Sequence, residues 1–279
     1  MITETGQFKT EDGLQLFTRT WLPEVTPKKS ILLVHGIGEH SGRYEHVAKM
    51  LTEQGCVVFS FDHRGHGHSE GKKGHIPSYA YVSRLLDQFC HGIKDRFPEM
   101  PVLIYGHSLG GAMVLYHLLN QTNTVTSAIV TSPGLAPANP PSKLLEVSAK
   151  ALSKIYPSGT INNMLDLSGL SKDQHVIEAY RNDPLNHDQV SFALGSEIIG
   201  KGSWILNHSS SLKIPVLLMQ GSADRLVNPA ATSQFAQSNQ RMITYKLWEN
   251  GYHELHNEPE KEDVFKEIKN WLENMDGRH

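Results

Sequence analysis

The sequence predicts an α/β protein with a mostly parallel central sheet, flanking helices and an inserted segment over one edge of the sheet. Two observations lead to this prediction. Short apolar runs, typical of fully buried parallel strands, alternate along the chain with amphipathic segments of helical period. This alternation stops after Pro133 and returns only in the run that begins at Lys213. Strands and helices in alternation indicate crossover connections, and hence a parallel sheet with helices on both faces.

The expected strands begin with residues 14–21, which alternate between apolar and polar side chains as a strand with one exposed face does. The other runs are short, mostly apolar and rich in β-branched residues, and they cover residues 30–36, 56–62, 102–106, 127–133, 215–221 and 243–249. Helices are expected over residues 42–53, 79–97, 109–120 and 260–274. Active sites of parallel sheets form at the carboxyl ends of the strands, so the residues that follow each run are candidates for function.

The long segment between the two core parts predicts a cap over this active edge. It contains no buried-strand signal, but residues 144–156 carry apolar side chains at helical spacing. We therefore divide the chain into a first core part (residues 1–135), a cap (136–212) and a second core part (213–279). Helices packed on the flank of the sheet would show the same periodicity, so that alternative stays open.

Composition excludes several other classes of protein. A chain of 279 residues suits one large domain, and a formal net charge of -3 gives no indication of a nucleic-acid partner. Two cysteines, Cys56 and Cys90, are too few for a disulfide scaffold. The polar amino terminus lacks the apolar core of a signal peptide, and no uninterrupted apolar run approaches the roughly 20 residues of a membrane-spanning helix. We expect a soluble, cytoplasmic protein.

A serine lies between glycines at the junction of one expected strand and the next helix. The sequence Gly106-His-Ser108-Leu-Gly110 follows the apolar run 102–106 and precedes the helix at 109–120. In that context the pattern is a nucleophile elbow, a strained turn that projects the serine hydroxyl above the sheet. The sequence therefore predicts Ser108 as a nucleophile.

A serine hydroxyl needs a base beside it and an acid behind the base, and in this architecture they follow in the order serine, acid, histidine. Asp224 lies just after the expected strand 215–221, and His253 follows the run 243–249. Both positions are at strand ends, so we favour Asp224 and His253. Glu249 as the acid and His256 as the base are the alternatives.

The reaction also needs backbone amides that stabilise the oxyanion of a tetrahedral intermediate. The amide of Leu109, at the start of the helix after Ser108, is one expected donor. The loop "HGIGEHSGRY" after the strand at 30–36 is expected to supply the second donor from Ile37, because its glycines allow tight packing.

Three closely spaced histidines, His63, His66 and His68, raise the alternative of a metal site. Their spacing provides neither the two-histidine face of a helical metal site nor a cysteine partner. A turn ordered by Asp62, Arg64 and the glycines is the better interpretation. We predict no metal and no cofactor.

Five segments together resemble one family. "HGIGEHSGRY", "FDHRGHGHSEG", "GHSLGGAM", "QGSADRLV" and "YHELHNE" are similar to the monoacylglycerol lipase family of α/β-hydrolases, whose members are also described as lysophospholipases. The resemblance runs from about residue 8 to 274 and includes "EAYRNDPL" in the cap. It implies an α/β-hydrolase fold, a triad of Ser108, Asp224 and His253, and oxyanion amides from Ile37 and Leu109.

The resemblance also implies contacts to a glycerol head group from Glu39, Arg43, Tyr180 and His256. Val227 stands where the mammalian enzyme has a cysteine, so sensitivity to thiol reagents at that position is not expected here. The cap is the least similar part, and acyl-chain preference is accordingly the least constrained property.

These observations favour a serine hydrolase that cleaves carboxylic esters of single-chain lipids, with monoacylglycerol as the first substrate. A general carboxylesterase, a lysophospholipase or a thioesterase would use the same triad. A catalytically inactive binding protein of the same fold is the competing class, and an intact triad argues against it. The expected partner is a lipid ester, and the helix at 144–156 is either a membrane-surface helix or a cap helix with one buried face.

Overall fold

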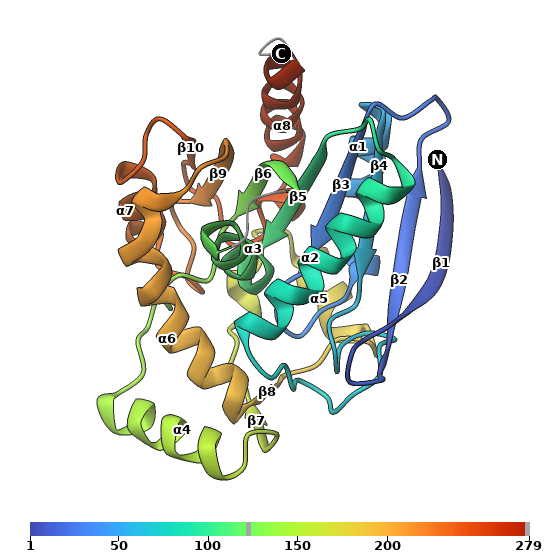
Figure 1. The fold of residues 1–279 in the computed structure, drawn as a ribbon. Coiled ribbons are helices and arrows are strands. Elements are labelled where there is room, and N and C mark those ends of the chain that lie inside the picture. Colours follow the sequence, from blue (N-terminus) through green and yellow to red (C-terminus); the bar gives the residue numbers. More distant parts are fainter. Residues whose placement is uncertain (121–123, 277–279) are drawn as a thin grey trace.

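A computed structural model gives the fold of residues 1–120 and 124–276 (Figure 1). Its centre is an 8-stranded sheet in the order β1-β2-β4-β3-β5-β6-β9-β10. The pairs from β4 to β10 are parallel, whereas β2 runs antiparallel to both β1 and β4. The strands are β1 (Ile2–Lys9), β2 (Gln15–Leu22), β3 (Lys29–Val34), β4 (Cys56–Phe61), β5 (Val102–His107), β6 (Val125–Thr131), β9 (Val216–Gly221) and β10 (Ile243–Trp248).

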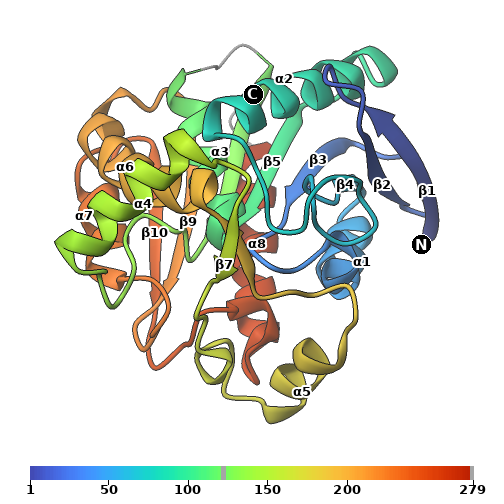
Figure 2. The same cartoon turned by 90° about the horizontal axis from the view of Figure 1, so that it is seen from below.

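Helices cover both faces of this sheet, as the sequence predicts. In Figures 1 and 2, α2 and α3 lie over one face, and α1 and α8 lie over the other. The helices are α1 (Glu45–Glu53), α2 (Tyr79–Arg96), α3 (Ser108–Asn120), α4 (Lys143–Ile155), α5 (Gln174–Asn182), α6 (Phe192–His208), α7 (Pro229–Gln237) and α8 (Lys261–Asp276).

The continuous apolar runs of the core strands follow from burial on both faces. Along β3, Leu32 and Val34 belong to the cluster that includes side chains of α2 and α3. Ile31 and Leu33 belong to the opposite cluster, which includes side chains of α1 and α8. All four side chains are completely buried, and each such burial contributes roughly 1.5–3 kcal/mol. Burial on both faces therefore favours apolar residues at successive positions of a strand in the middle layer.

Glycine permits the close packing between β5 and α3. A Cβ atom at Gly110 would lie 2.3 Å from the carbonyl oxygen of Val34, and one at Gly106 would lie 2.9 Å from that of Gly110. Between these glycines Ser108 has a φ of 53°, in the left-handed region that a side chain rarely adopts. The junction is thus a strained turn packed directly against the end of β3.

Residues 136–212 contain helices α4, α5 and α6 and a two-stranded antiparallel sheet of β7 (Thr160–Asn162) and β8 (Gln189–Ser191). Figure 2, which views the molecule from below, shows α4 and β7 in front of the central sheet. The sequence did not predict β7 and β8, because each has three residues and most of them are exposed or half-buried. Leu194 and Ile205 of α6 join the core cluster around α3, so this helix packs on the core as well.

Candidate active site

Three side chains from three strand ends form a hydrogen-bonded chain. Ser108 Oγ lies 2.9 Å from His253 Nε2, and His253 Nδ1 lies 2.8 Å from Asp224 Oδ2. Ser108 follows β5, Asp224 follows β9 and His253 follows β10. All three side chains are buried. The sequence predicted these residues, and the structure brings them into the spacing that proton transfer from a serine hydroxyl requires.

The surroundings of His253 favour its protonated form. Burial lowers the pKa of this imidazole, but the Asp224 carboxylate, with smaller contributions from Glu254 and Glu39, raises it, so that it lies above its ordinary value. Burial likewise raises the pKa of Asp224, while His253 and the amides of Val227 and Leu226 lower it below the ordinary value. Asp224 Oδ1 accepts hydrogen bonds from those two amides at 3.0 and 2.8 Å. The carboxylate is therefore held ionised and in a fixed orientation behind the imidazole.

The alternative acid and base lie elsewhere. Glu249 is exposed. His256 is completely buried and stacks on Tyr44, with ring centroids 5.0 Å apart. Neither ring nitrogen of His256 has a hydrogen-bond partner among the described residues, and burial holds its pKa well below the ordinary value. Neither residue is positioned to act as the acid or the base for Ser108.

A large cavity opens above Ser108 and His253. It has a volume of about 580 Å³, and both side chains contribute to its wall. Most of the remaining wall is apolar and comes from residues 136–212 and the β9 loop, including Ala136, Pro137, Val190, Ile198, Ile199, Leu226 and Val227. A single long acyl chain matches a cavity of this size and polarity.

Ile37 and Leu109, the residues expected to supply the oxyanion amides, both line this cavity next to Ser108. Ile37 belongs to the loop after β3, and Leu109 is the second residue of α3. The amide of the neighbouring Gly36 donates to Glu39 Oε1 at 2.6 Å, which fixes the start of the loop. Their role as oxyanion donors remains a prediction.

A second, small cavity of about 20 Å³ also borders Ser108. Its wall includes Glu39, Tyr180 and Leu165 together with Ser108 and His253. Glu39 and Tyr180 were expected to contact a head group, and they lie here, next to the reacting atoms. Arg43 and His256 are not among the residues that line either cavity beside Ser108.

Arg43 lies behind Glu39 in a buried network. Arg43 Nη1 donates to Glu39 Oε2 at 2.5 Å, and the guanidinium also binds both carboxylate oxygens of Glu254. The guanidinium carbon lies 4.7 Å from the centre of the Tyr180 ring. The sequence did not predict a role for Glu254, whose only signal was its position directly after His253. The network joins the loop of Glu39 to the loop of His253.

The two carboxylates in this network have different environments. Burial raises the pKa of Glu39, Arg43 lowers it and Glu254 raises it, with a net increase. Burial also raises the pKa of Glu254, but the bidentate contact with Arg43 outweighs this effect and lowers it strongly. Glu254 is therefore the carboxylate that Arg43 holds most firmly in its ionised form.

The histidine-rich segment forms a turn held by Asp62. Asp62 Oδ1 accepts the amide of Ser41 at 2.8 Å, and Oδ2 accepts the amide of His68 at 2.9 Å. His63 Nε2 pairs with the carbonyl oxygen of His35 at 3.1 Å. Within residues 1–120 and 124–276, no group of three or more His, Cys, Asp or Glu side chains is arranged to hold a metal ion. In the same residues, no helix combines the length and apolarity needed to span a membrane.

Comparisons with known proteins agree on one family. A model of the hydrolase family described as serine aminopeptidase, S33, matches residues 25–260. The chain is 36% identical to the monoglyceride lipase of Rattus norvegicus, over 94% of this chain and 88% of that protein. It is 35% identical to an abhydrolase domain-containing protein of Dictyostelium discoideum over 98% of this chain, which spans only 29% of that relative's length.

A solved structure shows that the fold is similar as well. The crystal structure of Paleococcus ferrophilus monoacylglycerol lipase matches with a TM-score of 0.86 and 30% sequence identity, over 92% of this chain and 98% of that chain. The fold, the family model and the sequence identity over most of both chains all indicate the same family. The chain belongs to the serine aminopeptidase S33 family of α/β-hydrolases and, within it, to the group that contains the monoglyceride lipases.

Proposed function

We propose that the protein hydrolyses the carboxylic ester of monoacylglycerol to glycerol and a free fatty acid. The observation that carries this proposal is the contact of 2.9 Å between Ser108 Oγ and His253 Nε2 at the wall of a mostly apolar cavity of about 580 Å³. The monoglyceride and monoacylglycerol lipases among the similar proteins support the choice of substrate.

In the proposed mechanism Ser108 attacks the ester carbonyl while His253 takes the hydroxyl proton. Asp224 orients the imidazole and stabilises its charged form. The amides of Ile37 and Leu109 donate to the oxyanion. His253 then gives its proton to the leaving alcohol, and water hydrolyses the acyl-enzyme by the same steps.

The large cavity beside Ser108 suits the acyl end of the substrate, and the small cavity of about 20 Å³ must widen to admit the glycerol end. The acyl chain enters the large apolar cavity, and the glycerol oxygen atoms lie on the side of Glu39 and Tyr180. Arg43 acts indirectly in this proposal, because it holds Glu39 and Glu254 rather than facing a cavity. His256 packs behind the site and lines neither cavity beside Ser108, and its contact with glycerol stays an untested prediction.

A substrate panel separates this proposal from a general carboxylesterase, a lysophospholipase or a thioesterase. We would measure kcat/KM for monoolein, methyl oleate, triolein, oleoyl lysophosphatidylcholine and oleoyl-CoA. Monoolein should be the best substrate, because methyl oleate leaves the polar groups near Glu39 unpaired, at about 1–3 kcal/mol each. Equal rates for monoolein and methyl oleate would contradict the glycerol site.

Glu39→Gln is the matched variant for that panel, since an amide keeps the oxygen that accepts the Gly36 amide. We expect it to lower kcat/KM for monoolein more than for methyl oleate.

If the wild-type protein fails to react with a fluorophosphonate probe, it is a binding protein rather than a hydrolase.

We further propose that α4 contacts a membrane surface and that the protein acts there from the cytoplasm. Leu144, Val147 and Ile155 share one side of this helix and are 79%, 65% and 81% exposed. Lys143, Lys150 and Lys154 on the same helix would favour anionic lipid. Sedimentation with anionic vesicles tests this contact: the double variant Leu144→Ser, Ile155→Ser should lose binding and keep its turnover of a dispersed short-chain ester.

A further inference from the structure

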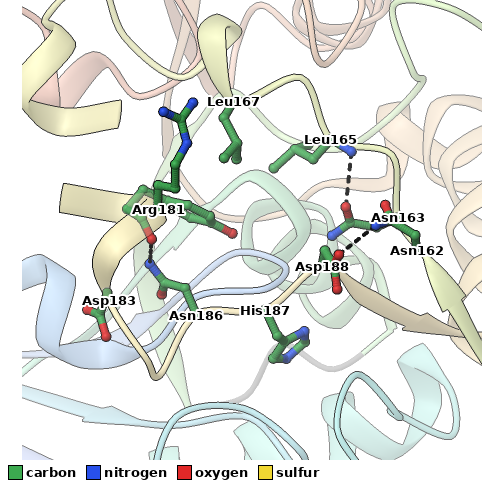
Figure 3. A pocket seen from close by; sticks show the side chains of 10 residues that line it. Asn162, Asn163, Leu165, Leu167, Arg181, Asp183, Asn186, His187 and Asp188 are labelled. Carbon is green, nitrogen blue, oxygen red and sulfur yellow. Dashed lines mark hydrogen bonds between the residues drawn. The ribbon is translucent and has the colours of Figure 1, made fainter. Parts of the chain in front are cut away.

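Two groups of polar side chains near the triad are not used by the proposed mechanism. The first lines a cavity of about 300 Å³ within residues 162–188, and two of its members, Asn163 and Asn186, are hydrogen-bonded to backbone atoms of the same segment (Figure 3). Ser108, Asp224 and His253 do not line this cavity. The second group lies behind Asp224 and contacts the triad directly.

Gln220 is the central member of this second group. It interrupts the apolar strand β9, and its side chain is completely buried. A buried amide destabilises a fold unless its polar atoms are hydrogen-bonded. Gln220 Nε2 donates to Asp224 Oδ2 at 2.9 Å and to the carbonyl oxygen of Gly221 at 3.2 Å. Its Oε1 accepts the hydroxyl of Thr232 at 2.8 Å, so both ends of the amide are bound.

These partners determine which way the amide is turned. A carbonyl oxygen and an ionised carboxylate can only accept hydrogen bonds, so the amide nitrogen must face Gly221 and Asp224. The pKa of Asp224 lies below its ordinary value, because His253 and two backbone amides outweigh the effect of burial, and its carboxyl is therefore ionised. The oxygen of Gln220 then faces Thr232, which is completely buried on α7. The threonine hydroxyl thus fixes the orientation of the amide.

Gln220 and His253 bind the same oxygen of Asp224. Oδ2 lies 2.9 Å from Gln220 Nε2 and 2.8 Å from His253 Nδ1. Oδ1 is held separately, by the amides of Leu226 and Val227. Without Gln220, the imidazole would be the remaining hydrogen-bond partner of Oδ2 among these contacts, although Asp224 has to orient that imidazole.

Gln220 and Thr232 are not among the residues that line either cavity beside Ser108. Neither side chain is therefore placed to touch the substrate. Any effect of these two residues on the reaction must act through Asp224.

We propose that Gln220, held in place by Thr232, is a positioning residue that keeps Asp224 Oδ2 in line with His253 Nδ1. The proposal rests on the esterase function proposed above. It adds no step to the reaction, because the amide keeps both of its protons and the proton of Ser108 still moves to His253.

The groups around His253 decide which measurement reports on this role. Asp224 raises the pKa of His253, and the carboxylates of Glu254 and Glu39 raise it further, while burial lowers it. The ring of His107 also faces this imidazole, with the centroids 4.8 Å apart. A substitution at Gln220 leaves the other groups in place and changes only how Asp224 is held. The acidic limb of kcat/KM is therefore the informative readout.

Gln220→Met keeps a side chain of similar length and removes the donor to Asp224. Loss of a hydrogen bond to a charged group should lower kcat for monoolein about 10- to 100-fold and leave KM unchanged. The acidic limb of kcat/KM should move to lower pH, because a carboxylate that turns away raises the pKa of His253 less. A residue that only stabilises the fold would leave that limb in place.

Two substitutions of Thr232 test the same chain of contacts without changing Gln220. Thr232→Val has a similar shape but lacks the hydroxyl, so it should cause the same changes at smaller size. Thr232→Ser keeps the hydroxyl and should behave like the wild type. Gln237→Met is the control, because this exposed glutamine of α7 donates to Ser233 rather than to the triad. It should change neither kcat nor the acidic limb. Urea unfolding checks that each variant is folded.

Three results would overturn the positioning role. The first is a folded Gln220→Met protein with the kcat and acidic limb of the wild type. The second is an equal effect of Thr232→Val and Thr232→Ser. The third is an acidic limb that moves to higher pH, which would mean that Gln220 only weakens the charge on Asp224. Failure of the wild type to hydrolyse monoolein would instead contradict the proposed function.

Discussion

Arg43 and Glu254 form a buried bidentate ion pair, in which Nη1 and Nη2 of the arginine donate to the two carboxylate oxygens at 2.7 and 2.8 Å. Arg43 Nη1 also donates to Glu39, which accepts the amide of Gly36. Gly36 precedes Ile37, and Glu254 follows His253. One arginine therefore ties the loop of the predicted oxyanion donor to the loop of the predicted base.

Replacing this arginine should destabilise the protein strongly. The side chains of Arg43 and Glu254 are 10% and 2% exposed, so Arg43→Met leaves the buried carboxylates without their cation. Breaking a buried pair in this way costs about 3–5 kcal/mol in the free energy of unfolding. Urea unfolding at neutral pH measures it. Arg225→Met is the control, because the ion pair of Arg225 with Asp166 is about half exposed and should contribute about 1 kcal/mol or less.

The pH dependence of that difference follows from the lowered pKa of Glu254. A carboxyl whose pKa is lower in the folded state stabilises the fold above its unfolded pKa of about 4.3, and this contribution is lost as the pH falls through the folded value. The difference between wild type and Arg43→Met should therefore shrink below about pH 4. An equal difference at acidic and neutral pH would show that packing, not charge, holds the network.

The activity should fall at acidic pH with a midpoint above the ordinary histidine value of about 6.5. His253 must be neutral to accept the serine proton. Burial lowers its pKa, but the nearby carboxylates, Asp224 foremost, raise it above the ordinary value. Asp224→Asn removes the raising charge, so the acidic limb of kcat/KM should move to lower pH while the rate drops on the order of 10⁴-fold. If the acidic limb of kcat/KM does not move in this variant, the titration belongs to a group other than His253.

Gly110→Ala should lower both stability and turnover. Its methyl group would lie 2.3 Å from the backbone oxygen of Val34, and no side chain can move to make room. Gly92→Ala is a matched control within α2, because no atom lies within 4 Å of its Cβ position. That substitution should stabilise the protein by about 0.5–1 kcal/mol. A Gly110→Ala variant as stable as the wild type would contradict the tight junction of β5 and α3.

The wild-type protein should resist thiol reagents, and Val227→Cys should make it sensitive. Cys56 and Cys90 are buried, and burial raises the pKa of Cys90 to about 12. Val227 lines the large cavity, so a thiol there meets a reagent that enters it. Activity after N-ethylmaleimide treatment checks this. Inactivation of the wild type would mean that Cys56 or Cys90 becomes accessible.

The sequence predicted the core of the fold because the core strands are buried on both faces, which leaves a continuous apolar pattern. It missed β1, whose eight residues are exposed except for one half-buried position. An edge strand is held by backbone hydrogen bonds to its single neighbour β2, and these leave no side-chain pattern. The sequence also missed α5 and α7, which have nine residues each.

The predicted site depended on chain order and strand ends, which the sequence displays directly. Ser108, Asp224 and His253 were accessible to that reasoning because each follows an apolar run. Glu254 was not, because its partner Arg43 lies 211 residues away and only the folded chain brings them together. His256 shows the converse: its motif suggested contact with substrate, but the structure packs its ring against Tyr44.

The turnover of monoolein by purified Ser108→Ala tests the central claim most directly. The hydroxyl of Ser108 is assigned a chemical role, so its removal should leave the urea unfolding midpoint unchanged. Turnover should fall on the order of 10⁴-fold or more relative to the wild type. A folded Ser108→Ala protein that retains a tenth of the wild-type turnover, on the order of a tenfold loss rather than 10⁴-fold, would contradict the assignment of Ser108 as the nucleophile.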